Sequence, residues 1–182
     1  MQTKVFHYTL TAFCAAIIAV LAQITIPLPL VPITGQTLAI GLVVTILGLK
    51  FGTYAVILYV CLGAFGLPVF QLFTGGFGIL VGPTGGYILG FIPTALVIGL
   101  YLKWFGTTFK HAVIANLIGM FITLLFGAAW LKIAANLTWG AAFLSGIAPF
   151  IIVGIIKGVI AAWLDVIVRE RLIHARMLEK LT

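Results

Sequence analysis

Residues 66–91, GLPVFQLFTGGFGILVGPTGGYILGF, interrupt an otherwise apolar chain with a run that is rich in glycine and proline. The chain as a whole is 63% apolar and has only 10 Lys and Arg and 3 Asp and Glu among its 182 residues. Irregular backbone cannot face lipid, because each unpaired N–H or C=O group costs several kcal/mol in hydrocarbon. This run is therefore expected at the surface, inside the protein or along a cavity, and the last two are where small solutes bind.

The composition is typical of membrane proteins, since a soluble core of this length does not need so little charge. We expect an all-α integral membrane protein with a single domain over residues 1–182, because no polar block is long enough to fold separately in water. The N-terminal residues lack a clear small-residue cleavage site, so we interpret them as leading into the first span rather than as a removed signal. Six spans are expected, over residues 8–26, 36–49, 51–65, 85–104, 110–131 and 145–168.

The basic residues predict the orientation of these spans. With both termini in the cytoplasm, Lys132 faces outward and Lys157 falls within a span. The other eight basic residues then lie on the inner side, several of them in a charged helical tail: Lys4, Lys50, Lys103, Lys110, Arg169, Arg171, Arg176 and Lys180. This bias follows the positive-inside rule, and it explains the net charge of +7 better than nucleic-acid binding does. The irregular segments 27–34 and 66–84 then emerge on the outer side, where they are placed to cover a cavity.

Lys157 is the single residue that most strongly suggests a ligand. An ammonium inside a span costs about 2.5–3.5 kcal/mol on insertion scales, so it usually faces the protein interior and has a partner. One interpretation is that Lys157 binds an anionic group of a solute, such as a carboxylate. The alternative is a side chain that reaches an interface. The inner interface is too distant, whereas the outer one is within reach if the helix begins near Pro149.

Asp165 is the only acidic residue within the apolar region. It lies about 12 Å further along the helix than Lys157, which excludes a close pair. It either accepts hydrogen bonds from a solute or joins an inner network with Arg169, and we favour the second interpretation. Small residues beside both charges allow close helix packing or leave room for a ligand: Gly154, Gly158, Ala161 and Ala162.

Two further sets of residues indicate contacts with helices or solutes. Alanines in the first span predict a docking face for another helix, from this protein or from a partner: Ala12, Ala15, Ala16 and Ala19. Neutral polar side chains near membrane depth suit a solute with amide-like groups, or else bond neighbouring helices: Gln23, Thr34, Gln36, Thr37, Tyr87 and Asn116.

The sequence has no motif for catalysis or nucleotide binding. It contains no GxxxxGK[ST], HExxH or GxSxG pattern. Cys14 and Cys61 lie in apolar runs and are expected to be buried free thiols, and the 3 histidines have no metal-ligand spacing. We therefore expect a protein that is not an enzyme and that holds no metal or cofactor.

Four runs, IPLPLVPITGQTLAI, LGAFGLPVF, GPTGGYILGF and PFIIVGIIK, occur in an order and at spacings that resemble the BioY family. These are the biotin-specific substrate-binding S components of energy-coupling-factor (ECF) transporters. The resemblance covers nearly the whole chain. It implies a six-helix protein of the bacterial plasma membrane that captures biotin at the outer side. It also implies a transmembrane coupling protein (T component) and two cytoplasmic ATPases as partners, with the alanines of the first span matching the face that docks on the coupling protein.

The resemblance also implies a set of biotin-binding residues. The carboxylate of biotin is expected at Lys157. The ureido group is expected to contact neutral or acidic side chains: Asn116, Gln36 and Asp165. Thr34 is expected as a further polar contact. Aromatic residues are expected to wall the pocket: Tyr87, Phe70 and Phe73. The family motif Asp-x-x-Lys has Gly154 in place of its aspartate, so that role is either vacant or moved to Asp165 or Asn116.

Two other functions stay open from the residues alone. One is a stand-alone channel or secondary carrier for a small neutral or anionic solute, although carriers often show inverted repeats and we find no convincing internal repeat. The other is a membrane scaffold whose small-residue faces only hold helices together, but a scaffold does not need Lys157 within the membrane.

Overall fold

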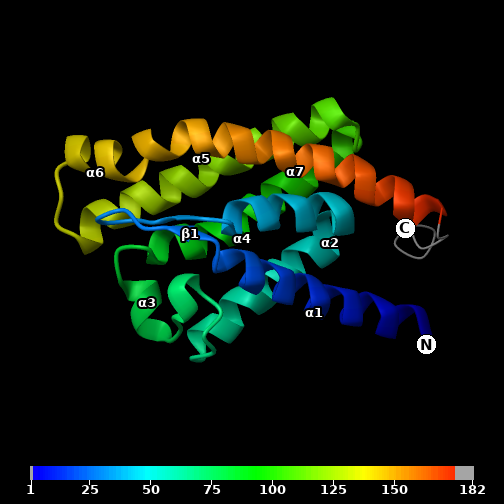
Figure 1. The fold of residues 1–182 in the computed structure, drawn as a ribbon, viewed down its shortest axis with the longest axis horizontal. Helices are drawn as coiled ribbons and strands as arrows, with labels where there is room; N and C mark the ends of the chain where they lie inside the picture. Colours follow the sequence, from blue (N-terminus) through cyan, green and yellow to red (C-terminus); the bar gives the residue numbers. More distant parts are fainter. Residues whose placement is uncertain (1, 175–182) are drawn as a thin grey trace.

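Helices make up most of the regular structure (Figure 1). The computed structural model describes residues 2–174. Its helices, in chain order, are α1 (Gln2–Ala22), α2 (Gln36–Ala64), α3 (Phe77–Val81), α4 (Gly85–Phe105), α5 (Phe109–Ala134), α6 (Trp139–Gly146) and α7 (Ala148–His174), with a 3-10 turn η1 (Gln71–Phe73). The predicted helical class is confirmed. Part of the predicted charged tail, including Arg176 and Lys180, lies outside the described residues.

A short antiparallel ribbon follows α1. β1 (Thr25–Ile26) pairs with β2 (Ile33–Thr34), so that Thr25 lies opposite Thr34. Prolines between the strands lack an N–H and cannot continue a helix. The expected irregular segment 27–34 therefore forms the loop and the second strand of a hairpin, which the sequence did not predict. The N–H of Gly35 also donates to the Ile24 carbonyl at 2.9 Å, which closes the ribbon at its base.

Helix α2 is a helical hairpin rather than one straight rod. Gly48 has φ 74° and ψ −176°, a conformation outside helical geometry that glycine adopts readily. Gln36 donates to the Tyr59 hydroxyl at 2.6 Å, although a straight helix would place two residues 23 positions apart about 35 Å from each other. The two arms correspond to the second and third expected spans, with the reversal just before the predicted turn at Lys50.

Five helical stretches are long and apolar enough to cross a membrane: Val5–Ala22, Gln36–Ala64, Gly85–Phe105, Phe109–Ala134 and Trp139–Val168. The second of these is the α2 hairpin, and the fifth joins α6 to α7. These stretches support a multi-pass membrane protein. The expected count of six crossings stays a prediction, because the two arms of α2 form one continuous apolar stretch.

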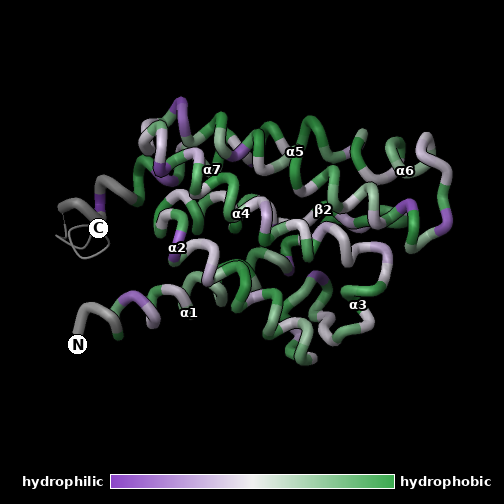
Figure 2. The backbone as a smooth tube through the Cα atoms, turned by 180° about the vertical axis from the view of Figure 1, so that it is seen from behind, coloured by the Kyte–Doolittle hydropathy of each residue, from purple (hydrophilic) through white to green (hydrophobic). Residues whose placement is uncertain are grey.

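Large apolar side chains cover the outside of the bundle. More than half of the side chain is exposed in residues on α5 and α7: Phe121, Leu125, Ile152, Ile156 and Trp163. Figure 2 shows hydrophobic chain along the length of the helices. Such a surface is unusual for a soluble monomer but suits contact with lipid. Cys14 and Cys61 are both free; Cys14 is buried as expected, whereas Cys61 is exposed.

Helix α4 lies between α2 and α5, and α7 packs over α5 and α2. Helix α1 packs mainly against α2 and leaves its other face uncovered. The start of α1 and the described end of α7 lie at the same end of the bundle, whereas the β ribbon, α3 and α6 lie at the opposite end (Figure 1). The two long non-helical connections, after α1 and after α2, are therefore gathered together at that opposite end.

The α2 hairpin generates a prediction at Gly52. A Cβ added there would lie 2.7 Å from the Val44 Cα, a backbone atom on the other arm that cannot turn aside. We expect Gly52→Ala to lower the free energy of unfolding by about 1–3 kcal/mol. The control is Gly140→Ala, since nothing lies within 4 Å of a Cβ at that helical position. Thermal unfolding in detergent measures both, and equal melting temperatures would contradict the close approach of the two arms.

Candidate functional site

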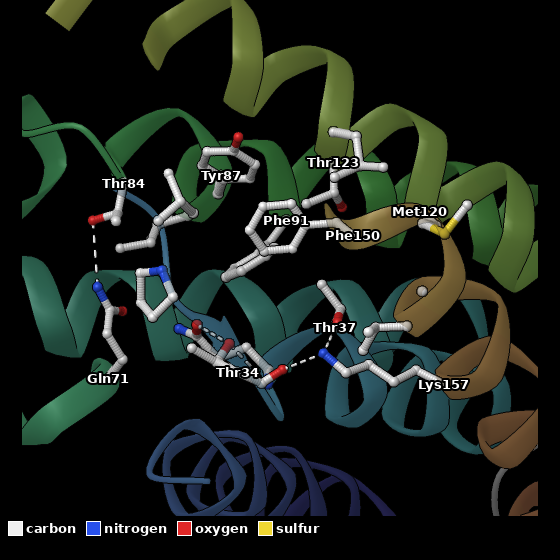
Figure 3. A pocket seen from close by; sticks show the side chains of 17 residues that line it. Thr34, Thr37, Gln71, Thr84, Tyr87, Phe91, Met120, Thr123, Phe150 and Lys157 are labelled. Carbon is white, nitrogen blue, oxygen red and sulfur yellow. Dashed lines mark hydrogen bonds between the residues drawn. The ribbon is translucent and has the colours of Figure 1, made fainter. Parts of the chain in front are cut away.

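A cavity lies among β2, α2, η1, α4, α5 and α7 (Figure 3). The empty space between its walls is about 590 Å³, counted out to open solvent at its mouth. The cavity is thus lined by segments that lie far apart in the sequence.

One side of the cavity is an apolar and aromatic wall. Tyr87 and Phe91 project from successive turns of α4, and Phe150 joins them from the first turn of α7. The rings of Tyr87 and Phe150 have centroids 6.1 Å apart. Tyr87 also donates from its hydroxyl to the Gly146 carbonyl at 2.7 Å. It packs directly on Gly127, where a Cβ would overlap its ring. This wall is consequently held in place by contacts with α5 and α6.

Lys157 enters the cavity from α7. Its ammonium donates to the Thr34 carbonyl at 2.6 Å and contacts the Thr37 hydroxyl at 3.5 Å (Figure 3). It shares one helix face with other lining residues at spacings of three, four and seven: Phe150, Val153 and Gly154. A lysine ammonium has three donors and no acceptor. Its partners here are neutral oxygens at the edge of the ribbon and on the first turn of α2.

Neutral amides and hydroxyls lie elsewhere around the cavity. Gln71 donates to the Thr84 hydroxyl at 3.4 Å, and Figure 3 places this pair on the side opposite Lys157. Gln36 accepts from the Thr34 hydroxyl at 2.6 Å and donates to Tyr59. These groups offer hydrogen bonds to a ligand without adding charge.

A second, smaller cavity adjoins the first, with about 360 Å³ of empty space. The two cavities share five lining residues: Thr37, Met120, Thr123, Gly154 and Lys157. Asn116 lines the second cavity, where its amide donates to the Ala112 carbonyl at 2.9 Å and contacts the Thr45 hydroxyl at 3.5 Å. Met120 lies directly over Gly154, since a Cβ there would overlap the Met120 sulfur. A larger side chain at position 154, such as the aspartate that the resemblance implies there, would therefore overlap Met120.

The structure brings together some of the residues expected at the site. Four line the larger cavity: Lys157, Gln36, Thr34 and Tyr87. Four others do not. Phe70 is fully buried against Tyr59, Phe73 is 72% exposed, Asn116 lines only the second cavity, and Asp165 is fully buried outside both linings.

Sequence reasoning missed several lining residues. Phe150 lies seven residues before Lys157, and Phe91 lies four after Tyr87, so helical spacing from the expected residues would have found both. Met120 follows Asn116 by four residues in the same way. Gln71 and Thr84 lie in the glycine-rich segment, where no periodicity exists to indicate which side chains point inward.

The alanines of the expected docking face are divided between two environments. Ala12 and Ala16 are exposed on α1, whereas Ala15 is buried and Ala19 is half-buried against the core. Exposed apolar residues on the same helix flank the two exposed alanines: Tyr8, Phe13 and Val20. The uncovered face of α1 is therefore apolar and flat at its centre.

Comparison with known proteins gives a consistent result. The BioY family model matches residues 1–174. The chain is 42% identical over 163 residues to the biotin transporter BioY2 of Lactococcus lactis, covering 87% of each chain. It is 35% identical over 169 residues to the probable biotin transporter BioY of Pyrococcus horikoshii, covering 93% of this chain and 97% of that one. The solved S-component for biotin from an ECF-type ABC transporter is similar with a TM-score of 0.86 at 30% identity, covering 93% of each chain.

The sequence motifs, the fold and the family match agree. The family match extends over every described residue, and the structural similarity covers 93% of the chain. The chain therefore belongs to the BioY family.

Proposed function

We propose that this chain is the biotin-binding membrane subunit, or S component, of an ATP-driven ECF-type vitamin uptake transporter. Its relatives are named biotin transporters, and the similar solved structure is an S-component for biotin. The observation that carries the proposal is the position of Lys157. Among the described residues that line the larger cavity, Lys157 is the only one with a charged side chain.

The chemistry of biotin suits the arrangement of the cavity. The Lys157 ammonium provides a charge-assisted hydrogen bond for the biotin carboxylate. Gln71 and Thr84 lie on the other side and offer neutral donors and acceptors to the ureido group, as does Gln36. The aromatic wall lies alongside, and it suits the apolar thioether ring and chain. An elongated ligand with one anionic and one amide-like end fits this order of groups.

Fewer residues are proposed to contact biotin directly than the sequence suggested. They include Lys157, Gln36, Thr34 and Tyr87, because these residues line the larger cavity. Asn116 lines the adjoining cavity, so it contacts the ligand only if the ligand extends past Met120. No direct contact is proposed for residues outside both linings: Phe70, Phe73 and Asp165.

The proposal extends to orientation and partners. Six crossings with both termini in the cytoplasm agree with the two described chain ends lying at one end of the bundle (Figure 1). The cavity then opens to the outside, beside the β ribbon. The chain has no phosphate-binding loop, so the energy comes from partners: a T component in the bacterial plasma membrane and two cytoplasmic ATPases. Docking on α1 at Ala12 and Ala16, followed by ATP hydrolysis, tilts or reshapes the subunit and releases biotin inward.

The first prediction from the proposed function concerns the charge of Lys157. We expect Lys157→Met to weaken biotin binding by roughly tenfold to a hundredfold, because a hydrogen bond to a charged group is lost. Equilibrium titration of the detergent-solubilised protein with biotin and with biotinamide measures the effect. The wild type should prefer biotin, and the variant should lose that preference. Lys132→Met is the control, since Lys132 lies over the Trp139 ring and outside both cavities. If the wild type bound the two ligands equally well, the proposed contact between Lys157 and the biotin carboxylate would be wrong.

The second prediction concerns the contact between Gly154 and Met120. A methyl group at position 154 would overlap the Met120 sulfur, so the floor between the cavities would have to shift. We expect Gly154→Ala to weaken biotin binding by about tenfold. The same change in a Met120→Ala background should have a much smaller effect, because the overlapping group is gone. Isothermal titration of the four proteins tests this, and equal effects in both backgrounds would contradict the steric explanation.

The third prediction separates binding from transport. Ala16→Trp places a large ring on the exposed face of α1, a helix that lines neither cavity. Biotin affinity of the isolated subunit should stay within about twofold, while biotin uptake by cells that express the whole transporter should fall at least about tenfold. Ile152→Trp, at an exposed position of α7, is the control for membrane insertion. Normal uptake with Ala16→Trp would exclude this face from docking.

A further inference from the structure

We propose that Gln23 is a positioning residue that ties one wall of the biotin site to α1. This inference rests on the proposed biotin-binding function and adds a residue that does not line either cavity. Gln23 lies directly after the last residue of α1, Ala22. Its side chain reaches the segment between α2 and α3, nearly 50 residues further along the chain.

The Gln23 amide makes three hydrogen bonds. Its nitrogen donates to the Ala19 carbonyl at 2.9 Å and to the Phe70 carbonyl at 3.0 Å. Its oxygen accepts from the Phe73 N–H at 2.9 Å. One side chain thus holds the residue before η1, the last residue of η1 and the last turn of α1 at the same time.

The turn that Gln23 holds is strained. Leu72 has φ 56° and Phe73 has φ 55°, so two successive residues with a Cβ adopt the left-handed region. Their side chains are 62% and 72% exposed, so little burial offsets this strain. Residues in such conformations persist only where their surroundings hold them. Hydrogen bonds from Gln23 at both ends of the turn supply such a constraint from outside the segment.

The held turn positions the cavity wall. Gln71 lies between the two contacts with Gln23, and its side chain lines the cavity and donates to Thr84. The Phe70 ring is fully buried, overlaps the space of a Gly63 Cβ and meets the Tyr59 ring edge-on at 5.6 Å. The Tyr59 hydroxyl in turn accepts from Gln36, which also lines the cavity.

These contacts link α1 to the proposed ligand. A displacement of α1 would pull on Phe70 and Phe73 through Gln23, and so would move Gln71 at the cavity. Loss of the link should let the turn open more often, which shortens the time that biotin stays bound. If Gln23 served only to satisfy local backbone groups, its loss would lower stability without changing the dissociation rate of biotin.

The test is the dissociation rate of biotin from the full-length protein in detergent, measured by chasing labelled biotin with an excess of unlabelled biotin. We expect Gln23→Leu to raise this rate about tenfold, with the association rate changed by less than about twofold. Thr9→Val is the control, because the Thr9 hydroxyl lies on the same helix and bonds only locally, to the Val5 carbonyl. A dissociation rate within about twofold of the wild type, in a Gln23→Leu protein that melts normally, would overturn the proposal.

A second measurement uses the wild type and does not depend on the variant folding. Hydrogen exchange should show a protected Phe73 amide in the unliganded protein, and biotin should slow its exchange further. Exchange of this amide at the rate of an open chain would overturn the proposal even if biotin binds tightly. Failure of the wild type to bind biotin would instead remove the proposed function, while a protected Phe73 amide would still support the tether.

Discussion

Hydrocarbon provides no hydrogen-bond partners, and this constraint explains where the non-helical chain of this protein lies. The segment after α1 pairs with itself as β1 and β2. The glycine-rich segment bonds to the surrounding helices: Gly76 donates to the Gly63 carbonyl at 2.7 Å, and Trp130 donates to the Gly82 carbonyl at 3.0 Å. Both segments therefore lie against protein at one end of the bundle. The packing that gives their backbone groups hydrogen-bond partners also brings the polar side chains of the two segments together around the cavity.

Lys157 connects this end of the bundle to α7. An ammonium within a span needs oxygen partners, and Thr34 supplies its carbonyl from the last residue of the ribbon. The ribbon and α7 thus depend on each other, although 123 residues separate them in sequence. Both bonded oxygens are neutral, so a ligand carboxylate offers a stronger partner than either. Binding of an anion would compete for the same donors that hold the edge of the ribbon.

Small residues decide how closely the walls of the site approach each other. Gly127 lets the Tyr87 ring rest on α5, and Gly154 lets Met120 lie across the boundary between the two cavities. The aspartate that the resemblance implies at position 154 would therefore meet the Met120 sulfur rather than open space. Neither Asn116 nor Asp165 moves into the larger cavity in its place. The boundary between the two cavities is therefore shaped by Met120.

The sequence predicted α4 and α5 to within about three residues at each end, because apolar runs, proline and charge are local signals. It placed the end of the first span at residue 26 rather than at Ala22, and it did not predict α6. It also singled out Lys157, since a charge within a span is conspicuous on its own. It failed where side-chain direction depends on distant contacts. Phe70 and Phe73 were expected to wall the pocket, but the turn held by Gln23 buries one against Tyr59 and exposes the other. The ribbon and the contact of Met120 with Gly154 were likewise unforeseen.

The amino-acid sequence by itself determined the membrane class, the helices, the cation and the resemblance to the BioY family, because hydrophobicity, charge and motif order can be read from neighbouring residues. Only the tertiary structure decided which polar side chains share the cavity, and that Gln71 and Thr84 face Lys157 across it. The physical reason is that the direction of each side chain within a glycine-rich segment is set by hydrogen bonds to helices far away in the chain. Gln23, nearly 50 residues from the turn that it holds, is the plainest example.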